Sequence, residues 1–358
     1  MIISRTPYRL SFFGGGTDYP AWYRRYDGAV LATTIDKYCY LTCRYLPPFF
    51  EHRIRIVWSK IESCHTTGEI SHPAVREVLR FLQIERGVEI HHDGDLPARS
   101  GMGSSSAFTV GLLHALYALK GKIVSKHQLA MEGIHLEQEL LQETVGSQDQ
   151  VSAAYGGFNH VVFSKSGEIT VRPVTIPAER VHELNSHLLL FFTGINRTAS
   201  EVAESYVTDV ESKAHHLRVI GGMVDEGISI LSSGEDVVRF GKLLGESWQA
   251  KRSLGDKVTN SHVEEIYGSA LAAGAIGGKL TGAGGGGFLL LFVPPPDQPR
   301  VRERLRHLLH VPFRFEYSGS QIIFFDQETD YFAEEWARRN HRIETFRELS
   351  ELEERGER

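Results

Sequence analysis

The chain has 358 residues, of which 41% are hydrophobic and 23% charged, and its formal net charge is −6 at pH 7. This length favours two lobes over a single core, and the composition is that of an ordinary globular protein. The negative charge argues against a general nucleic-acid binder, and no apolar run approaches the roughly 20 residues that a membrane helix needs.

The N-terminal half alternates between strand and helix patterns. A period of two in the apolar positions is typical of a strand, whereas recurrence at three and four residues is typical of a helix. On these patterns strands are predicted at 1–13, 29–45, 52–58 and 87–92, and helices around 75–82, from 104 to 121 and from 126 to about 142.

Two of these helices have recognisable ends. The helix that starts at Ser104 carries its apolar side chains on one stripe and closes at Gly121, a favoured residue after a helix end. Ser125 and Gln128 have the form of a capping box, which predicts a new helix at that point.

The C-terminal half also mixes strands and helices. The whole pattern indicates an α+β protein with mixed strands, whose predicted domains are 1–185 and 186–358, with the break near 180–190. Strands are predicted at 158–163, 168–174, 187–193, 288–293, 313–317 and 321–325, helices over much of 199–273, and a charged helical tail, packed on the outside, from about 328.

Three glycine-rich segments stand out: FFGGGTDYP at 12–20, LPARSGMGSSSAF at 96–108 and GGKLTGAGGGGF at 277–288. The middle segment follows a predicted strand, and its serines open a long apolar helix. Glycine lets backbone N–H groups approach an anion, and a helix N-terminus adds unpaired donors and a favourable dipole. The segment therefore predicts a phosphate cradle, and a serine-capped helix after a flexible loop is the alternative interpretation.

Common nucleotide-binding signatures are absent from the sequence. No GxxxxGK[ST] occurs, and a serine stands where the dinucleotide fingerprint would need a third glycine after Gly101 and Gly103. The HRD, DFG and VAIK-type segments of protein kinases are missing as well. A serine hydroxyl at the helix start would still suit Mg²⁺, because hard cations prefer oxygen ligands.

In order and spacing, the three segments resemble the GHMP kinases, the family of galactokinase, homoserine kinase, mevalonate kinase and phosphomevalonate kinase. The resemblance covers roughly residues 4–330, and its strongest part is PARSGMGSSSA followed by KLTGAGGGGF about 180 residues later. It implies an N-terminal lobe similar to domain 2 of ribosomal protein S5, a C-terminal α/β sandwich lobe, and ATP and Mg²⁺ as cofactors.

The resemblance also assigns residues to the nucleotide and the metal. Ser105 matches the serine that helps to hold Mg²⁺, and Glu139 looks like its carboxylate partner, with Glu137 as the alternative because the spacing varies. Without the resemblance, the glutamates of this helix read as a solvated face. The implied nucleotide-binding residues are Pro97, Gly101, Met102, Gly103, Ser104, Ser105, Ser106, Gly282 and Gly284.

The segment GSQDQ at 146–150 resembles the family segment that carries the catalytic aspartate. Asp149 is then the implied base for the acceptor hydroxyl, a role in which position matters more than a raised pKa. Arg9 matches a site arginine and is expected to lie against Asp149, where it would keep the carboxylate ionised or stabilise developing charge. A lone aspartate in a polar loop is otherwise usually a cap or turn residue.

The first segment bears on the acceptor. Asp18 matches a sugar-binding aspartate of galactokinase-like enzymes, but Gly15 and Gly16 stand where galactokinases have a Glu-His pair. This difference removes a carboxylate and opens space for a bulkier or negatively charged substituent. The residues implied to contact the acceptor are Gly15, Gly16, Thr17, Asp18, Lys37 and Arg197.

Within the family, these segments look most like the bacterial branch that phosphorylates the anomeric hydroxyl of D-glycero-D-manno-heptose 7-phosphate, giving the 1,7-bisphosphate. An acceptor with its own phosphate needs cationic groups, and an arginine fork suits phosphate well. Arg197 and Lys37 are the candidates, while the adjacent Arg24 and Arg25 are typical of a solvated turn.

Two alternatives stay open. One is a kinase of a free sugar, such as fucose or galactose, or of an isoprenoid alcohol; the other is a catalytically silent member that senses a ligand. The presence of Ser105, Glu139 and Asp149 argues against silence. The expected partner is a small-molecule substrate, without nucleic acid or membrane, and a homodimer is left open.

The cellular compartment is read from the N-terminus and the cysteines. MIISRTPYRL lacks the basic segment and apolar core of a secretory signal. Cys39, Cys43 and Cys64 cannot form a disulfide framework and read as structural thiols. A cytoplasmic protein is therefore expected.

Overall fold

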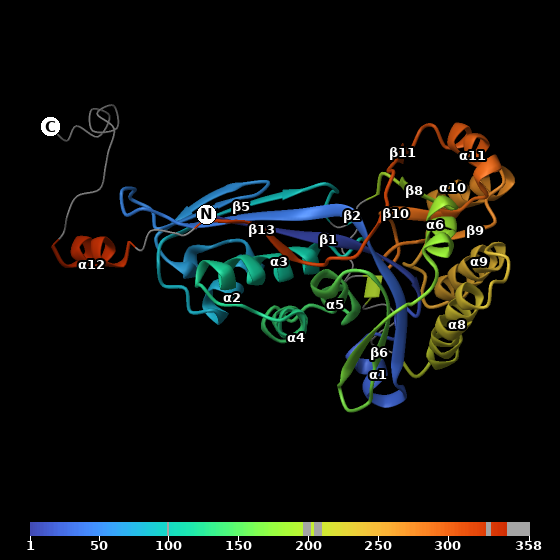
Figure 1. Ribbon diagram of the computed structural model, residues 1–358, viewed down its shortest axis with the longest axis horizontal. Helices are drawn as coiled ribbons and strands as arrows, with labels where there is room; N and C mark the ends of the chain where they lie inside the picture. The colour runs from blue at the N-terminus through green and yellow to red at the C-terminus, as the bar shows by residue number, and fades with distance from the viewer. Residues whose placement is uncertain (99, 196–201, 204–209, 327–330, 342–358) are drawn as a thin grey trace.

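The computed structural model describes residues 1–358 apart from 99, 196–201, 204–209, 327–330 and 342–358. The molecule is elongated: a large lobe of sheet and helices lies at one end, and a smaller lobe of helices around a second sheet lies at the other (Figure 1). The long strands β1 (Ile2–Phe13) and β2 (Gly28–Tyr45) run from the large lobe toward the small one.

The large lobe is built on a nine-stranded sheet, in which the long strand β2 pairs with β6 along its first part and with β5 along its last part. Its first residues, from Gly28 to Thr33, pair with β6, and its last, from Cys39 to Tyr45, pair with β5. The strands besides β1 and β2 are β3 (Ile54–Val57), β4 (Ile61–Cys64), β5 (Val88–Gly94), β6 (Phe158–Phe163), β7 (Ile169–Pro173), β12 (Phe315–Glu316) and β13 (Gln321–Phe325).

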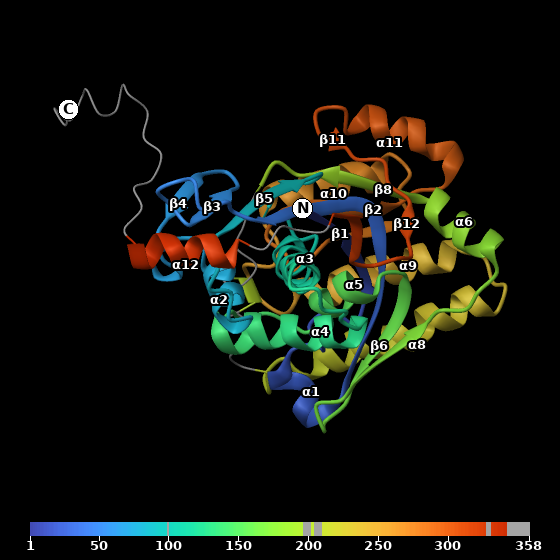
Figure 2. The same ribbon diagram turned by 60° about the vertical axis from the view of Figure 1, so that its left-hand side comes forward.

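Helices cover one face of this sheet (Figure 2). The central one, α3 (Ser104–Leu119), is buried along most of its length, which explains why its sequence is apolar on more than one side. Its start and length confirm the predicted helix. Around it lie α2 (Pro73–Phe81), α4 (Lys126–His135), a π-helical turn η2 (Leu136–Leu140) and α5 (Gln148–Tyr155).

Local chemistry sets the path from α4 to α5. The side chain of Ser125 accepts a hydrogen bond from the N–H of Gln128 at 3.1 Å, as the capping pattern predicts. The helix then widens, because the N–H of Leu141 donates to the carbonyl oxygen of Leu136, five residues back, at 2.8 Å. On this wider turn Glu137 faces inward and Glu139 is exposed.

The smaller lobe contains a four-stranded antiparallel sheet in the order β11, β8, β10, β9. Its two central strands are apolar and almost wholly buried, as expected for strands covered on both faces. The strands are β8 (Leu188–Phe192), β9 (Gly277–Leu280), β10 (Phe288–Phe292) and β11 (Leu309–His310), and the helices are α6 (Ala178–Ser186), α8 (Ala214–Ser232), α9 (Val238–Arg252), α10 (Ser261–Ala272) and α11 (Gln298–Arg304).

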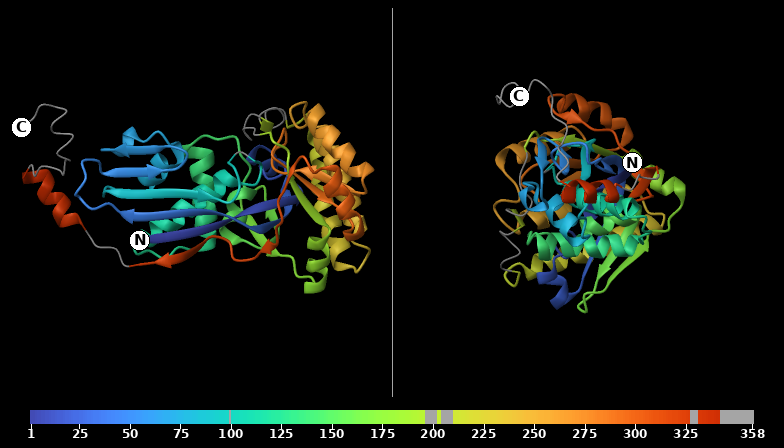
Figure 3. Two further views of the ribbon diagram at one scale, coloured as in Figure 1. Left: turned by 90° about the horizontal axis from the view of Figure 1, so that it is seen from above. Right: turned by 90° about the vertical axis from the view of Figure 1, so that its left-hand side faces the viewer.

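The chain returns to the large lobe after β11, which corrects the predicted second domain. Strand β13 pairs antiparallel with β1, and β12 pairs with β2, so both belong to the nine-stranded sheet. Helix α12 (Phe332–His341) lies at the end of the large lobe remote from the small one (Figure 3). The salt bridge of Glu335 to Arg53 fixes it there. A simple division near residue 185 therefore misplaces these last elements.

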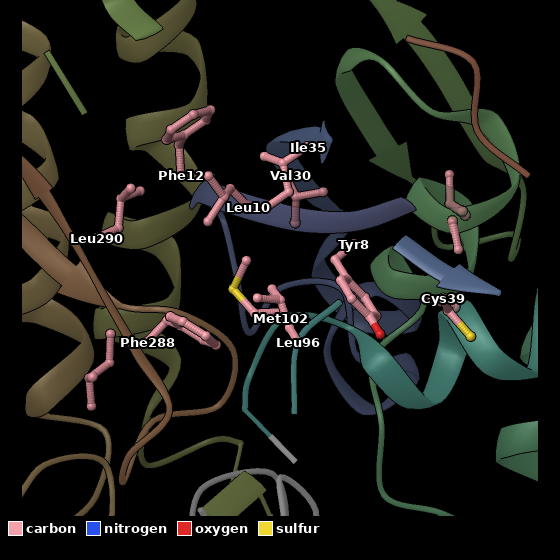
Figure 4. Close-up of a cluster of buried hydrophobic side chains, with 14 of the residues drawn as sticks. Tyr8, Leu10, Phe12, Val30, Ile35, Cys39, Leu96, Met102, Phe288 and Leu290 are labelled. Carbon is pink, nitrogen blue, oxygen red and sulfur yellow. The ribbon is translucent and has the colours of Figure 1, made fainter. Parts of the chain in front are cut away.

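A continuous hydrophobic cluster runs through both lobes. Figure 4 shows Leu10 and Phe12 of β1 beside Phe288 and Leu290 of β10, with Met102 from the middle glycine-rich segment between them. All five side chains are fully or almost fully buried. This packing holds the two lobes together at the level of the glycine-rich segments.

Three short elements complete the fold. They are α1 (Pro20–Tyr26), η1 (Thr67–Glu69) and η3 (Pro295–Asp297). The three cysteines are free and buried, as expected for structural thiols. Within the described part of the chain, no helix combines the length and the apolar character that crossing a bilayer requires.

Candidate functional site

The middle and third glycine-rich segments lie backbone against backbone where the lobes meet. A Cβ atom on Gly101 would stand 2.6 Å from the carbonyl oxygen of Thr281, and one on Gly282 would stand 2.6 Å from the Cα of Gly101. Both glycines adopt left-handed backbone, with φ of +77° and +69°. Any larger side chain would force the two segments apart, so glycine is required at both positions.

Helix α3 begins directly beside this contact. Gly103, at φ +73°, is its N-cap residue, and no side chain caps the first turn. Ser105 is exposed and Ser104 partly exposed, whereas Met102 is buried in the core. An uncapped helix start next to a glycine loop suits an anion such as a phosphate. Met102 contributes packing rather than a side chain to this cradle.

Arg9 and Asp149 form the central ion pair of the site. The Arg9 guanidinium donates to both carboxylate oxygens of Asp149, at 2.7 and 2.6 Å, and to the carbonyl oxygen of Gly101 at 2.6 Å. The Arg9 side chain is 5% exposed and that of Asp149 24% exposed. The bidentate fork fixes the direction of the carboxylate, while its exposure leaves room for a ligand. The structure thus brings together the residues predicted to be the base and its arginine.

This pair lies against the phosphate cradle. A Cβ atom on Gly103 would be 3.4 Å from Oδ2 of Asp149 and 3.2 Å from Cγ of Arg9. The start of α3 and the start of α5 therefore face each other across a short gap. A phosphoryl group held at the first would lie close to a hydroxyl group held at the second.

Asp18 ties the first glycine-rich segment to the start of α5. Its carboxylate accepts hydrogen bonds from the backbone N–H groups of Gly16 at 2.9 Å and Gln148 at 3.4 Å. Burial raises its pKa, the Gly16 N–H opposes this, and the nearby Asp149 raises it further. Asp18 is 1% exposed, so in this arrangement it positions the loop and α5; contact with an acceptor stays a prediction.

Gly146 makes this approach of Asp18 possible, a role that the sequence did not reveal. A Cβ atom at Gly146 would fall 1.9 Å from Oδ2 of Asp18, a distance that no side chain tolerates. The glycine of GSQDQ is therefore a steric requirement for the link between two of the predicted site segments.

Glu137, not Glu139, faces the start of α3. Its Oε2 accepts hydrogen bonds from the Ser106 hydroxyl at 2.8 Å and from the Gln150 side-chain amide. Oε1 is buried and forms no hydrogen bond among the described residues, although the Thr109 hydroxyl lies near enough to lower the pKa of the carboxyl group. Burial raises the pKa of Glu137 to about 7, which the Ser106 hydrogen bond opposes and Glu143 reinforces.

The predicted pair of Ser105 and Glu139 is not brought together. Glu139 is exposed on the π-helical turn, and Glu137, two residues earlier, takes the inward position. A buried carboxylate oxygen without a partner, beside hydroxyls at a helix start, fits a hard cation. No group of three or more metal-ligating side chains occurs among the described residues. Mg²⁺ often needs only one or two protein carboxylates, because phosphates and water supply the rest.

Two buried lysines from the small lobe also reach this region, and the sequence did not single them out. Lys251 on α9 donates to the carbonyl oxygen of Gly282, and Lys279 on β9 donates to that of Phe12 at 2.9 Å. Burial lowers the pKa of Lys251 to about 8 and that of Lys279 well below its ordinary value. Both lysines lie close enough to Arg9 for its positive charge to lower their pKa values further.

The predicted acceptor-side residues divide into several groups. Thr17 is buried, and its hydroxyl donates to the carbonyl oxygens of Gly14 and Ala29 at 2.8 and 2.9 Å, which stabilises the loop. Lys37 is bound to its neighbour Asp36 at 3.1 Å, and its ammonium makes no contact with Arg9 or Asp149 in the described structure. The structure therefore does not support Lys37 as a phosphate ligand. Arg197 lies outside the described residues.

Gly15 lies against two buried polar side chains. A Cβ atom on Gly15 would make ordinary van der Waals contact with the Gln148 side-chain amide nitrogen and the Ser11 hydroxyl, each at 3.7 Å. The Ser11 hydroxyl and the Gln148 Oε1 are both buried, and neither has a hydrogen-bond partner among the described residues. Unpaired buried polar atoms of this kind suit a hydroxyl-rich ligand. Neither residue was predicted from the sequence, because a lone serine or glutamine carries no signal of its own.

Of the other predicted nucleotide residues, Pro97 is exposed at the start of the middle segment. Gly284, at φ +115°, packs against the backbone of Val258, so a Cβ there would stand 2.5 Å from its carbonyl oxygen. The third segment is thus shaped by its contacts with the small lobe and the cradle. Chemically, the site offers an anion cradle, an oriented carboxylate, buried cations and unpaired polar atoms beside Gly15, which together suit transfer of a phosphoryl group to a hydroxyl.

Comparison with known proteins agrees with this geometry. Residues 70–157 match the family described as GHMP kinases N terminal domain, and residues 230–310 match GHMP kinases C terminal. The first range holds the cradle, Glu137 and Asp149, and the second holds Lys251 and the third glycine-rich segment.

Individual relatives extend the match over most of the chain. A D-glycero-alpha-D-manno-heptose 7-phosphate kinase from Campylobacter jejuni is 29% identical over 79% of this chain and 86% of its own. A galactokinase from Chloroflexus aurantiacus is 25% identical over 79% of this chain and 81% of its own.

Among solved structures, a D-glycero-D-manno-heptose 1-phosphate kinase from Bacteroides thetaiotaomicron superimposes with a TM-score of 0.75 at 25% identity. The alignment covers 91% of this chain and 100% of that one. With both family domains matched in order, the same two-lobed fold and the three glycine-rich segments at one site, the chain belongs to the GHMP kinases.

Proposed function

We propose that this kinase transfers the terminal phosphoryl group of ATP to the anomeric hydroxyl of a sugar phosphate, with D-glycero-D-manno-heptose 7-phosphate as its acceptor. The observation that carries the transfer chemistry is the bidentate Arg9–Asp149 pair facing the start of α3. The heptose acceptor is supported by the Campylobacter jejuni relative, whose name states that substrate.

The proposed chemistry assigns a step to each part of the site. Asp149 accepts the proton of the anomeric hydroxyl as its oxygen attacks the terminal phosphorus, while Arg9 holds the carboxylate in line. The backbone N–H groups at the start of α3 hold the phosphate oxygens. When bound, Mg²⁺ neutralises the donor phosphates, and Glu137 with the serines of this helix start would hold it.

The acceptor is proposed to lie beside Gly15, against Ser11 and Gln148. There the Ser11 hydroxyl and the Gln148 side-chain amide can form hydrogen bonds with sugar hydroxyls. Without a bound sugar, the Ser11 hydroxyl and Gln148 Oε1 have no partner among the described residues.

The resemblance implies a Glu-His pair in galactokinases at Gly15 and Gly16, and of these two positions Gly15 is the one where a side chain would not be crowded, since a Cβ on Gly16 would stand 3.0 Å from Leu217. The missing carboxylate favours a negatively charged sugar. Arg197 remains the proposed partner of the acceptor phosphate.

The test compares kcat/KM for heptose 7-phosphate, the same heptose without phosphate, galactose, fucose and mevalonate under matched ATP concentrations. Preferential use of heptose 7-phosphate supports the proposal. A higher kcat/KM for a free sugar or for mevalonate would assign the enzyme to another acceptor class within the family.

A further inference from the structure

Lys251 is a buried cation whose surroundings do not account for its burial. It lies on α9, its residue is 5% exposed, and one hydrogen bond of its ammonium goes to the carbonyl oxygen of Gly282. An ammonium carries three donors, and the described residues offer no carboxylate within salt-bridge distance of this one. A buried charge without a partner is costly, which points to a ligand that supplies the missing partner.

The charges around Lys251 favour an anion. Within this part of the described site, Arg9 on β1, Lys251 on α9 and Lys279 on β9 face two carboxylates, Asp18 after β1 and Asp149 on α5. Arg9 already pairs with Asp149, and burial raises the pKa of Asp18. Because the pKa of Lys279 is lowered well below its ordinary value, Lys251 is the buried ammonium of this group that has no carboxylate partner among the described residues.

The position of Lys251 indicates that the anion is a phosphoryl group. Its hydrogen-bond partner Gly282 touches Gly101, whose carbonyl oxygen binds Arg9. The ammonium thus lies across the loop contact from the Arg9–Asp149 pair, beside the cradle. This is where a phosphoryl group would pass between the donor and the acceptor.

We propose that Lys251 is a catalytic residue of the small lobe, whose ammonium contacts the phosphoryl group during its transfer. The inference rests on the proposed phosphoryl transfer, but not on the identity of the acceptor. As the bond from the terminal phosphorus to the bridging oxygen of the nucleoside triphosphate breaks, a bond to the acceptor oxygen forms, and the hydroxyl proton goes to Asp149. Lys251 gives up no proton; it stabilises the negative charge on the phosphoryl oxygens.

Lys251 should also make kcat/KM for ATP depend on pH. Its pKa is lowered to about 8, first by burial and then by Arg9, while Asp18 and Asp149 oppose the change. The ammonium is present below this pKa and is lost above it, so kcat/KM for ATP should fall as the pH rises through about 8. The unfolded chain binds the proton more tightly, so near neutral pH the charged lysine lowers the stability of the fold.

The experiment compares Lys251→Met, Lys251→Arg and Lys242→Met in the full chain. Lys242 lies on the same helix but is exposed, which makes it the matched control. We expect Lys251→Met to lower kcat by about a hundredfold, with small changes in KM and a Tm equal to or above that of the wild type. Lys242→Met should behave as the wild type. Lys251→Arg stays charged, so it should lose the fall in kcat/KM near pH 8.

Three results would overturn the inference. One is a folded Lys251→Met with near-normal kcat, and another is a clear loss of Tm, which would indicate a structural role. The third is an effect confined to KM for a phosphorylated acceptor, which would place the lysine on the acceptor's phosphate. Phosphoryl transfer can be followed through kcat for any accepted sugar or through ATP hydrolysis without a sugar. The test of Lys251 therefore remains valid even when heptose 7-phosphate proves to be the wrong acceptor.

Discussion

Replacing Glu137 by glutamine tests which carboxylate of the π-helical turn serves the site. Glutamine keeps the shape and can still accept the hydrogen bond from Ser106, but it cannot carry a negative charge. Glu139→Gln is the matched control, because Glu139 lies two residues away on the exposed side of the same turn.

The size and sign of the effect follow from the pKa. Burial raises the pKa of Glu137 from 4.5 to about 7, so between these values the folded protein binds a proton that the unfolded chain has lost. The wild type should therefore lose stability as the pH rises through this window. At 1.36 kcal/mol per pKa unit, the change amounts to at most about 3 kcal/mol. The Glu137→Gln variant should not show this pH-dependent loss of unfolding free energy.

The assay is urea unfolding at pH 5 and pH 8 in the presence of a metal chelator. Relative to the wild type, Glu137→Gln should gain about 2–3 kcal/mol of unfolding free energy between pH 5 and pH 8, whereas Glu139→Gln should follow the wild type. Adding Mg²⁺ and ATP should then stabilise the wild type more than Glu137→Gln. Parallel stability curves for Glu137→Gln and the wild type would refute the assignment of the buried carboxylate.

Three further changes probe other parts of the site. Asp149→Asn should lower kcat by about 10²–10⁴-fold while nucleotide binding, followed by calorimetry, persists; near-normal turnover would exclude Asp149 as the base. Gly146→Ala should cost about 1–3 kcal/mol of stability and reduce kcat, because its Cβ would meet Asp18 at 1.9 Å; a Tm and kcat matching those of the exposed control Gly222→Ala would contradict this. Arg197→Ala should weaken kcat/KM for heptose 7-phosphate by about ten- to a hundredfold and leave free heptose unaffected, and equal losses for both sugars would count against a phosphate contact.

Local patterns predicted much of the fold. The helix starts at Ser104 and Lys126 follow from capping and apolar spacing, and the buried strands β8 and β10 follow from short apolar runs. The return of β12 and β13 to the large sheet did not follow. Strand alternation identifies a strand but does not say which sheet it joins, since pairing depends on contacts hundreds of residues away.

Site residues that belong to a sequence motif were predicted. Residues whose orientation depends only on packing were not. The pairing of Arg9 with Asp149 followed from a resemblance between segments. Glu137 and Glu139 could not be separated, because a single π-helical turn changes which of them faces inward. Lys251 sits in an ordinary amphipathic helix, and only the docking of α9 against the glycine loops makes its charge meaningful.

The central claim is a phosphoryl transfer to the anomeric oxygen of a heptose that already carries a phosphate. The most direct measurement is phosphorus NMR of the product formed from ATP and D-glycero-D-manno-heptose 7-phosphate, with coupling to the sugar protons resolved. We predict a new phosphate ester resonance coupled to the anomeric proton alongside the retained 7-phosphate, and its absence with Asp149→Asn on the same timescale. A new phosphate on another carbon, or consumption of ATP with free sugars but not with heptose 7-phosphate, would contradict the claim.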